Sequence, residues 1–219
     1  MQKGKTFFNI IIIITVIALI SVIGYLTYYY ISNYIALKQA EKAVDEFENE
    51  VIVVAIDDEE NAQNEIQNEQ TPQTNQSTTN KTTSKVSYKG YSMIGTIQIP
   101  KTKVKAPIVD KVTTTSITAA AAVLYGPGLN EVGNTVIVAH NYRNGTFFSN
   151  NKKLVIGDKV YITDITGRKI EYTIYKTYLA SETEFDYATR DTAGKREISL
   201  STCTDNTKKR LIIFAKADV

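Results

Sequence analysis

The sequence predicts an all-β domain, either a barrel or a sandwich, preceded by one membrane-spanning helix. Two observations favour this fold class. Residues 6–37 carry no charged side chain, whereas most of the chain after residue 85 consists of short runs in which apolar and polar residues alternate. Turn signals rich in glycine, proline and asparagine separate these runs, which is typical of β-strands joined by short connections. The 219-residue chain is long enough for one globular domain and an anchor.

Residues 1–34 are predicted to form a short cytoplasmic tip and a transmembrane anchor. Residues 10–30 alone would span about 30 Å as a helix at about 1.5 Å per residue, which is the thickness of a hydrocarbon core. Lys3 and Lys5 precede the apolar run and acidic residues follow it, so the positive-inside rule places the N-terminus in the cytoplasm and the rest outside. A cleaved signal peptide is the alternative, but the run is longer than a typical signal and lacks a clean small-x-small cleavage site.

Residues 35–85 are predicted to be an acidic stalk that is partly helical and then disordered. Its first part has apolar residues at loosely helical spacing. These residues are Ile35, Ala43, Phe47, Val51 and Val54. In residues 58–85 the only large aliphatic residue is Ile66, and such a polar composition buries too little surface to offset the entropy of ordering. We therefore expect the globular domain to span residues 86–219, and we expect no earlier segment to pack against it.

Within residues 86–219 the alternating runs predict strands, and one alanine-rich stretch predicts a helix. Residues 115–124 contain four consecutive alanines and are predicted to form a short helix. Turns are expected at residues 126–128, 144–145 and 166–167. The strands are predicted around Ile97/Ile99, Val104/Ala106, Val136/Val138, Val160/Ile162, Ile170/Tyr172/Ile174, Ile198/Leu200 and Ile212/Phe214.

Charge is segregated between the two parts of the chain. Residues 1–85 hold 6 Lys and Arg against 11 Asp and Glu, whereas residues 86–219 hold 19 against 12. A basic domain outside the membrane suits an anionic cell envelope. We expect no nucleic-acid partner, because the basic residues are scattered and the location is wrong.

The single cysteine, Cys203, ends the alternating run 197–203, and the single histidine is His140. A lone cysteine outside the cell forms no internal disulfide, so it is either an inert buried thiol or a group kept for chemistry. If Ile198 and Leu200 face the core, Cys203 faces the opposite side, which predicts a thiol at a surface groove. A thiol nucleophile needs an acid or base partner and an oxyanion donor, for which His140 and Arg210 are candidates. An imidazole at the edge of the core, in phase with Val136 and Val138, is the alternative for His140.

Several motifs in order resemble the sortases, membrane-bound cysteine transpeptidases of Gram-positive bacteria. The resemblance covers about residues 88–217. The Cys203–Arg210 segment resembles class B sortases, whereas the interval from His140 to Cys203 is more similar to class A or D. The motifs are residues 95–100 (GTIQIP), 133–140 (GNTVIVAH), Gly145, Phe147, Gly157-Asp158, 200–203 (LSTC) and Arg210.

The resemblance implies an eight-stranded barrel with one or two short helices and a reaction that passes through a thioester. Cys203 would attack a threonine carbonyl in a C-terminal sorting signal, His140 would be the general acid and base, and Arg210 would hold the oxyanion. Thr202 and residues of the loop 181–195 would contact the substrate. These loop residues are Glu184, Phe185 and Tyr187. No cofactor is expected, although acidic residues of this loop are possible Ca²⁺ ligands.

The implied partners are surface proteins that carry a sorting signal, and an amine of a peptidoglycan precursor or a pilin. Two other functions are compatible with the same sequence features. A secreted cysteine peptidase would release the product to water, and a non-catalytic envelope-binding domain would leave Cys203 inert. Residues 71–75 (TPQTN) resemble a class B sorting signal, but a segment made mostly of Thr, Gln and Asn can produce such a match by chance.

Overall fold

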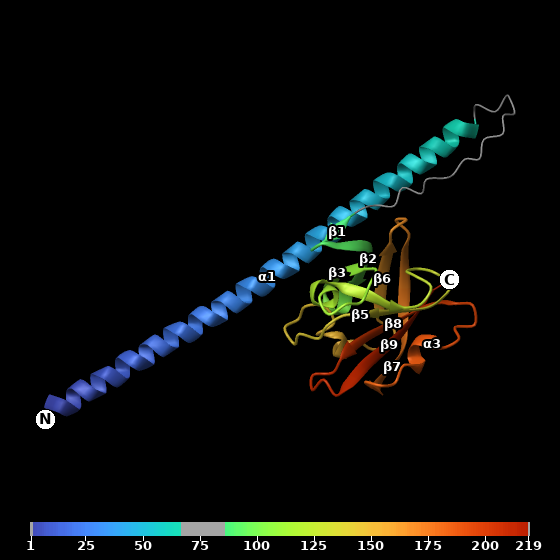
Figure 1. The fold of residues 1–219 in the computed structure, drawn as a ribbon. Coiled ribbons are helices and arrows are strands. Elements are labelled where there is room, and N and C mark those ends of the chain that lie inside the picture. The colour runs from blue at the N-terminus through green and yellow to red at the C-terminus, as the bar shows by residue number, and fades with distance from the viewer. Residues whose placement is uncertain (1, 67–85, 219) are drawn as a thin grey trace. The chain divides into compact units, whose positions relative to one another are not determined.

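The structure, a computed structural model, describes residues 2–66 and 86–218. The chain forms two compact units, Met1–Gln39 and Ala40–Val219. One helix, α1 (Gln2–Ile66), contributes to both units (Figure 1). The sorting-signal-like residues 71–75 lie outside the described residues.

The first unit is the apolar part of α1. The segment Phe7–Ile52 contains a stretch with a mean hydropathy of 2.8, which is long and apolar enough to cross a membrane. The hydroxyl groups of Thr15, Ser21 and Thr27 each donate to the carbonyl four residues earlier, at 2.8–2.9 Å. These bonds satisfy the polar side chains within the helix, as a lipid-exposed helix requires.

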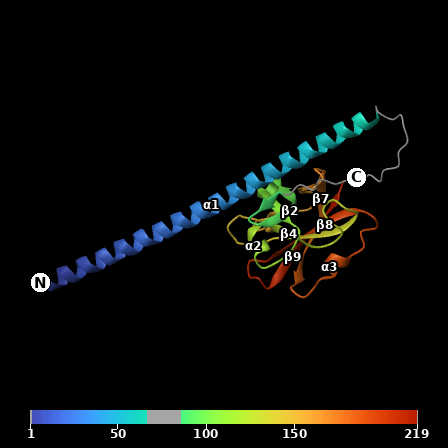
Figure 2. The same ribbon diagram turned by 45° about the horizontal axis from the view of Figure 1, so that its top comes forward.

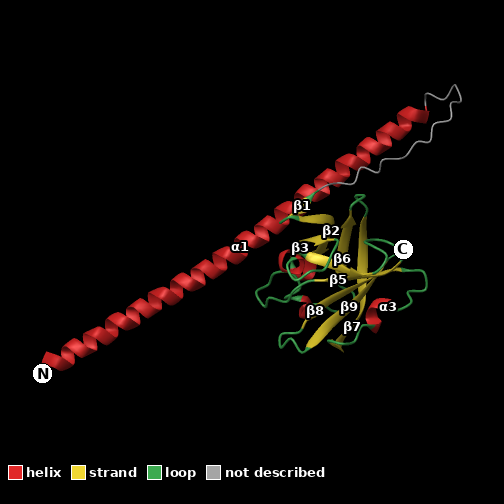
Figure 3. Cartoon of the chain, viewed as in Figure 1, coloured by secondary structure: helices red, strands yellow, loops and turns green. Residues whose placement is uncertain are grey.

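The second unit is a closed barrel of eight strands, which confirms the predicted fold class. The order around the barrel is β2-β3-β4-β5-β8-β9-β7-β6, and β6 pairs with β2 to close it. The two-residue strand β1 pairs with β2 outside this ring. Figure 3 distinguishes the yellow strands from the red helices, with α3 beside the barrel. The elements are β1 (Ser87–Tyr88), β2 (Tyr91–Ile99), η1 (Pro100–Thr102), β3 (Val104–Val109), α2 (Ser116–Ala119), β4 (Ala121–Tyr125), β5 (Gly133–Val138), η2 (Asn151–Lys153), β6 (Lys159–Asp164), β7 (Lys169–Ser181), α3 (Asp186–Thr189), β8 (Arg196–Cys203) and β9 (Lys209–Ala217).

The barrel interior holds one apolar core to which every strand of the ring contributes. The core residues on the strands that carry the candidate site are Ile137, Ile198, Leu200, Ile213 and Ala215. In β8 the inward residues are those that alternation predicted. In β5 and β9 the phase is the reverse of the one expected, because Val136, Ile212 and Phe214 belong to a second cluster outside the barrel.

The predicted helix over residues 115–124 is wrong for most of its length. Helix α2 ends at Ala119, and residues 121–125 form strand β4, beside which α2 lies (Figure 2). Ala121 and Ala122 pair in parallel with Ile108 and Val109 of β3. The helix propensity of alanine contributes little free energy per residue, so tertiary packing can override it. Here the small alanine side chains let α1 and α2 pack over strand β4.

The prediction that nothing before residue 86 packs on the domain is also wrong. Ala43, Phe47 and Val51, which the helical spacing had singled out, lie buried against Met93 and Val109 of the barrel. Helix α1 continues to Ile66, so residues 58–66 are helical rather than disordered. The sequence there is acidic, and its Glu, Ala and Gln residues are good helix formers.

Polar contacts anchor the same part of α1. The Glu48 carboxylate accepts hydrogen bonds from Thr96 Oγ1 and Gln98 Nε2, both at 2.8 Å, and from Thr163 Oγ1 at 3.2 Å. Lys105 of β3 forms an ion pair with Asp45. Residues of α1 from Ala40 onward are therefore part of the folded unit.

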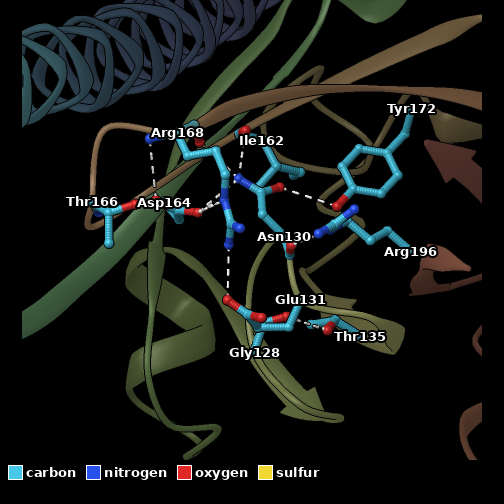
Figure 4. A network of polar contacts seen from close by, with 10 residues as sticks. All are labelled: Gly128, Asn130, Glu131, Thr135, Ile162, Asp164, Thr166, Arg168, Tyr172 and Arg196. Carbon is cyan, nitrogen blue, oxygen red and sulfur yellow. Dashed lines mark hydrogen bonds and ion pairs between the residues drawn. The ribbon is translucent and has the colours of Figure 1, made fainter. Parts of the chain in front are cut away.

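A buried polar network closes the barrel end at which β5 and β8 begin (Figure 4). Asn130 Nδ2 donates to Asp164 Oδ2 at 3.1 Å, and its Oδ1 accepts from the Tyr172 hydroxyl at 3.0 Å. Arg168 Nε donates to Asp164 at 2.9 Å, and Arg196 Nε donates to the Asn130 carbonyl at 3.0 Å. Because each buried group has a partner, this end of the barrel is fixed, and the opposite end is the one that carries the candidate site.

We expect the domain to need residues 40–52 for its stability. A fragment of residues 40–219 should unfold at a higher temperature than a fragment of residues 86–219. The shorter fragment lacks α1 and exposes the apolar surface around Met93 to water. Phe47→Ala should lower the free energy of unfolding by about 3–5 kcal/mol, the usual cost for a buried phenylalanine. Denaturant unfolding of the 40–219 fragment measures this change.

The matched control is Ile52→Ala, because Ile52 lies on the exposed side of the same helix, with 51% of its surface exposed. It should change the free energy of unfolding by less than about 0.5 kcal/mol. Equal stability of the two fragments would show that the helix does not contribute to the domain.

Candidate active site at the ends of two parallel strands

Cys203 is the last residue of β8, and His140 lies at the same level, two residues beyond the end of the neighbouring parallel strand β5. Strand β5 pairs with β8 in parallel, and the last pair of the register is Val138 with Ser201. His140 and Cys203 are each two residues beyond this pair. Because neighbouring strands lie about 4.8 Å apart, the register brings the only histidine and the only cysteine to the same end of the sheet.

Both side chains belong to the outer face of the barrel. Ile198 and Leu200 point into the core, so the alternation of β8 directs Cys203 outward, where the residue is half-buried. His140 shares its phase with Val136, whose side chain belongs to the cluster outside the barrel. The neighbouring residue, Ala139, belongs to the barrel core, so the alternation favours an imidazole on the outer side.

Arg210 is the direct cross-strand partner of Cys203. Strands β8 and β9 are antiparallel, and Cys203 pairs with Arg210. The Arg210 Nη1 donates to Cys203 Sγ at 3.4 Å. A permanent positive charge thus lies beside the sulfur, on the same face of the sheet.

The loop after β5 determines the surroundings of His140. The carbonyl of His140 accepts a hydrogen bond from the Phe148 N–H at 3.2 Å, and the Tyr142 ring lies 5.0 Å from the imidazole, centroid to centroid. Partial burial lowers the pKa of His140 below its usual value of 6.5. The neutral imidazole is therefore the major form at neutral pH.

Thr202 and Asn141 join the two strand ends through their side chains. Thr202 Oγ1 donates to the Ala139 carbonyl at 2.8 Å, so Thr202 supports the strand that carries His140. Asn141 Nδ2 donates to the Cys203 carbonyl at 3.0 Å. The sequence interpretation did not single out Asn141. Its position directly after His140, at the end of a strand, is the signal that could have identified it.

The loop between β7 and β8 covers the outer face next to this site, but its three predicted substrate residues differ in exposure. Tyr187 is buried with Ala188 against Ile212 and Phe214, so it packs beneath the loop. Phe185 is 43% exposed, and its ring lies 5.5 Å from the ring of Tyr187. Glu184 is half-buried and forms a hydrogen bond with Tyr178.

A buried polar network holds this loop against β5 and β8. Asn134 Nδ2 donates to the carbonyls of Tyr187 and Ala188 at 2.9 and 3.0 Å. Arg190 forms an ion pair with Glu197 at 2.5 Å, and its guanidinium lies 4.1 Å from the centroid of the Phe214 ring. Because these contacts fix the loop near Arg190, its exposed residues around Phe185 are the part best placed to meet a ligand.

Two cavities flank this region. One of about 310 Å³ lies at the barrel mouth and is lined by Asn141, Thr202, Cys203, Asp205 and Leu211, among others. Another of about 540 Å³ lies between the end of β4 and the α3 segment, and Tyr125 and Arg190 are among its lining residues. Within residues 2–66 and 86–218, no group of three or more His, Cys, Asp or Glu side chains is arranged to hold a metal ion. Calcium binding by the loop stays a prediction.

Comparisons with known proteins agree on one family. A family model described as the sortase domain matches residues 97–218. Among solved structures, the chain is similar to sortase A from Corynebacterium diphtheriae, with 25% identity and a TM-score of 0.54 over 59% of this chain and 62% of that one. It is also similar to a pilus-related sortase C of group B Streptococcus, with 30% identity and a TM-score of 0.53 over 58% of this chain and 68% of that one.

A third similar structure is a sortase D5 transpeptidase of Clostridium perfringens, with 27% identity and a TM-score of 0.53 over 58% of this chain and 80% of that one. The match with the Corynebacterium sortase A spans less than two thirds of the length of that chain. A search of curated proteins found no match.

We expect the imidazole of His140 to titrate below pH 6.5 when the thiol is removed. In Cys203→Ala, burial still disfavours the imidazolium, so the NMR signal of the single histidine should report a pKa lower than 6.5. The unfolded chain then binds this proton more readily than the folded one. The stability that depends on neutral His140 is therefore complete above pH 6.5 and lost as the pH falls below it. A measured pKa at or above 6.5 would contradict this prediction.

Proposed function

Because the chain belongs to the sortase family, we propose that it is a membrane-anchored cysteine transpeptidase. It would cleave the C-terminal sorting signal of secreted proteins after threonine and transfer the acyl group to an amine of the cell wall or of a pilin. The observation that carries the proposal is the arrangement at the ends of β5, β8 and β9. The only thiol has an arginine 3.4 Å from its sulfur, and the only histidine lies two residues beyond the end of the neighbouring strand β5.

The first half of the proposed reaction forms a thioester. The thiolate of Cys203 attacks the carbonyl carbon of the threonine, and a carbon–sulfur bond forms. As the tetrahedral intermediate collapses, the carbon–nitrogen bond breaks. The leaving nitrogen takes a proton from the His140 imidazolium and departs as an amine.

The second half reverses the proton transfer. A neutral acceptor amine attacks the thioester carbonyl and gives a proton to the now neutral His140, while the carbon–sulfur bond breaks and the thiolate of Cys203 is restored. Because burial lowers the pKa of His140, the imidazole is a ready proton acceptor in this half. The imidazolium needed for the first half is the minor form at neutral pH, which makes the reactive pair a small fraction of the enzyme.

Arg210 suits the role of oxyanion donor and not that of base. A guanidinium keeps its proton throughout the pH range of the reaction, so it cannot accept one from the thiol. It presents several N–H groups, and one of them already lies beside Cys203 Sγ, near the position where a negative oxygen would develop. The exposed Phe185 and the half-buried Glu184 beside it would contact the sorting signal.

The membrane location is part of the same proposal. The apolar stretch within Phe7–Ile52 would anchor the protein in the cell membrane, with the N-terminus in the cytoplasm and the barrel outside. A pilus-related sortase among the similar structures supports surface proteins and pilins as partner classes. The basic barrel domain suits an anionic envelope.

We expect Cys203→Ala to abolish turnover and leave the barrel folded. The thiol is the proposed nucleophile, and a half-exposed side chain at a strand end contributes little packing. His140→Ala and Arg210→Ala should each lower kcat about 100-fold or more, the usual scale for losing a general acid or an oxyanion donor. Cleavage of sorting-signal peptides measures turnover, and circular dichroism checks the fold.

A control variant is Lys176→Ala on β7, which removes a cation that lies over the Phe214 ring and away from the thiol. It should retain peptide cleavage. Near-normal rates for His140→Ala or Arg210→Ala would remove that residue from the site, and an unfolded Cys203→Ala would assign the cysteine to structure.

Transpeptidation and hydrolysis are separated by the fate of the thioester. In a peptide library, added primary amines should attack the acyl-enzyme and release an amide adduct in place of the free acid, because the amine competes with water for the same thioester. Mass spectrometry distinguishes the adduct from the free acid. Release of the free acid alone, at every amine concentration, would favour a cysteine peptidase.

A further inference from the structure

The backbone pairing of β5 with β8 weakens before it reaches the site. The register ends at Val138 and Ser201, and the next bond, from Ala139 N to Ser201 O, is 3.4 Å long. Such a length is beyond the usual range for this kind of bond. The ladder brings His140 and Cys203 to the same level of the sheet, and their exact separation depends on the contacts beyond its last bond.

Two side-chain hydrogen bonds lie on either side of this pair. Thr202 Oγ1 donates to the Ala139 carbonyl at 2.8 Å, one residue before each member of the pair. Asn141 Nδ2 donates to the Cys203 carbonyl at 3.0 Å, from the residue directly after His140. The second bond joins the histidine segment to the cysteine itself.

The amide of Asn141 is held in one orientation. Its second N–H donates to Asp205 Oδ1 at 3.0 Å, and its Oδ1 accepts from the Arg143 N–H at 3.0 Å. The carbonyl of Cys203 and the ionised carboxylate of Asp205 can only accept, and the backbone N–H of Arg143 can only donate. A flipped amide would therefore lose all three bonds.

Asp205 is a suitable anchor for this amide. Lys152 Nζ lies 2.6 Å from Asp205 Oδ2. The hydrogen bond from Lys152 and, after it, the one from Asn141 lower the pKa of Asp205 below its usual value, so the group is ionised at neutral pH. A charged acceptor makes the bond from Asn141 stronger than one between neutral groups.

We propose that Asn141 is a positioning residue that sets the separation of the His140 imidazole and the Cys203 thiol, with Asp205 as its anchor. The proposal rests on the proposed function, because it assigns Asn141 to the same reacting pair. Asn141 touches neither reacting side chain through its amide. It acts through the backbone of Cys203 and through its own place beside His140.

The test measures the coupling between the two reacting groups directly. The full chain in detergent micelles is labelled with ¹³C at histidine Cε1, which gives one signal because the chain has one histidine. The signal is titrated in the wild type and in Cys203→Ala, and the difference between the two titrations reports the influence of the thiol on the imidazole. The same comparison is made in the Asn141→Asp background.

Asn141→Asp is the informative substitution because it keeps the size of the side chain and removes both donors. We expect the thiol-dependent difference in the His140 titration to shrink by at least half, and kcat/KM for peptide cleavage to fall about tenfold or more, as for other misplaced reacting groups. Asp205 is exposed, and Asp205→Ala leaves the hydrogen bond from Asn141 to the Cys203 carbonyl intact. This variant should therefore lower the thiol-dependent difference and kcat/KM by less than Asn141→Asp does.

The matched control is Asn206→Asp in the turn between β8 and β9. Asn206 uses its amide oxygen to accept from Thr204 Oγ1 at 2.7 Å and from Lys208 N at 3.2 Å, and aspartate keeps that acceptor. This variant should retain the wild-type coupling and turnover. A residue with a merely structural role would lower the unfolding temperature and leave the coupling unchanged.

The possible results separate this proposal from the proposed function. An unchanged thiol-dependent difference in both Asn141→Asp and Asp205→Ala would overturn the positioning role and leave the transpeptidase intact. Identical titrations of the wild type and Cys203→Ala would show that the two groups do not interact, and both proposals would fail. If Asn141→Asp does not fold, Asp205→Ala decides the matter by the same measurement.

Discussion

The parallel pairing of β5 with β8 is the constraint on which the candidate site depends. Parallel strands end at the same edge of a sheet, so His140 and Cys203, which are more than sixty positions apart in the sequence, lie at the same end of two neighbouring strands. The antiparallel pairing of β8 with β9 then brings Arg210 opposite Cys203. The order of strands in the sheet therefore brings His140, Cys203 and Arg210 to the same end of three neighbouring strands.

The outer face of the barrel shows how a reactive groove can coexist with a packed surface. Ser199 lies two residues before Ser201 on the same outward face, yet it is fully buried and donates to Asn134 at 2.8 Å. Glu197 is paired with Arg190 and accepts from Tyr175 at 2.6 Å. Burial raises the pKa of Tyr175 to about 12, so its hydroxyl stays a donor. The outer face is covered at the start of β8 and opens only near its end.

The sequence predicted the structure correctly where a single residue type or a regular alternation of apolar and polar residues was sufficient. The alternation in β8 placed Ile198 and Leu200 inside and Cys203 outside, and the chain offers only one histidine and one cysteine as candidates for the reacting pair. It was misleading at residues 121–125, where alanines form a strand because of neighbours distant in the sequence. The phase of β5 and β9 was also inaccessible, since both faces of these strands are apolar and alternation alone cannot tell the inside of the barrel from its covered outside.

The packing of α1 on the barrel could not be predicted from the sequence either. The spacing of Ala43, Phe47 and Val51 indicated an apolar face, but only the folded barrel shows the surface that receives it. Asn141 was missed for a related reason, because a polar residue after a strand has no distinctive pattern until its hydrogen-bond partners are known.

The carboxylate of Glu48 binds across the seam of the barrel, because Thr96 and Gln98 lie on β2 and Thr163 lies on β6, the two strands whose pairing closes the ring. The bond between Glu48 and Thr163 joins residues 115 positions apart. Contacts of such long range form late, because the chain between them must first be ordered. A chain made from its N-terminus therefore presents α1 early and cannot complete the hydrogen bonds of this carboxylate until β6 has been synthesised. Closure of the barrel and attachment of the helix are then expected to be one cooperative event at the end of folding.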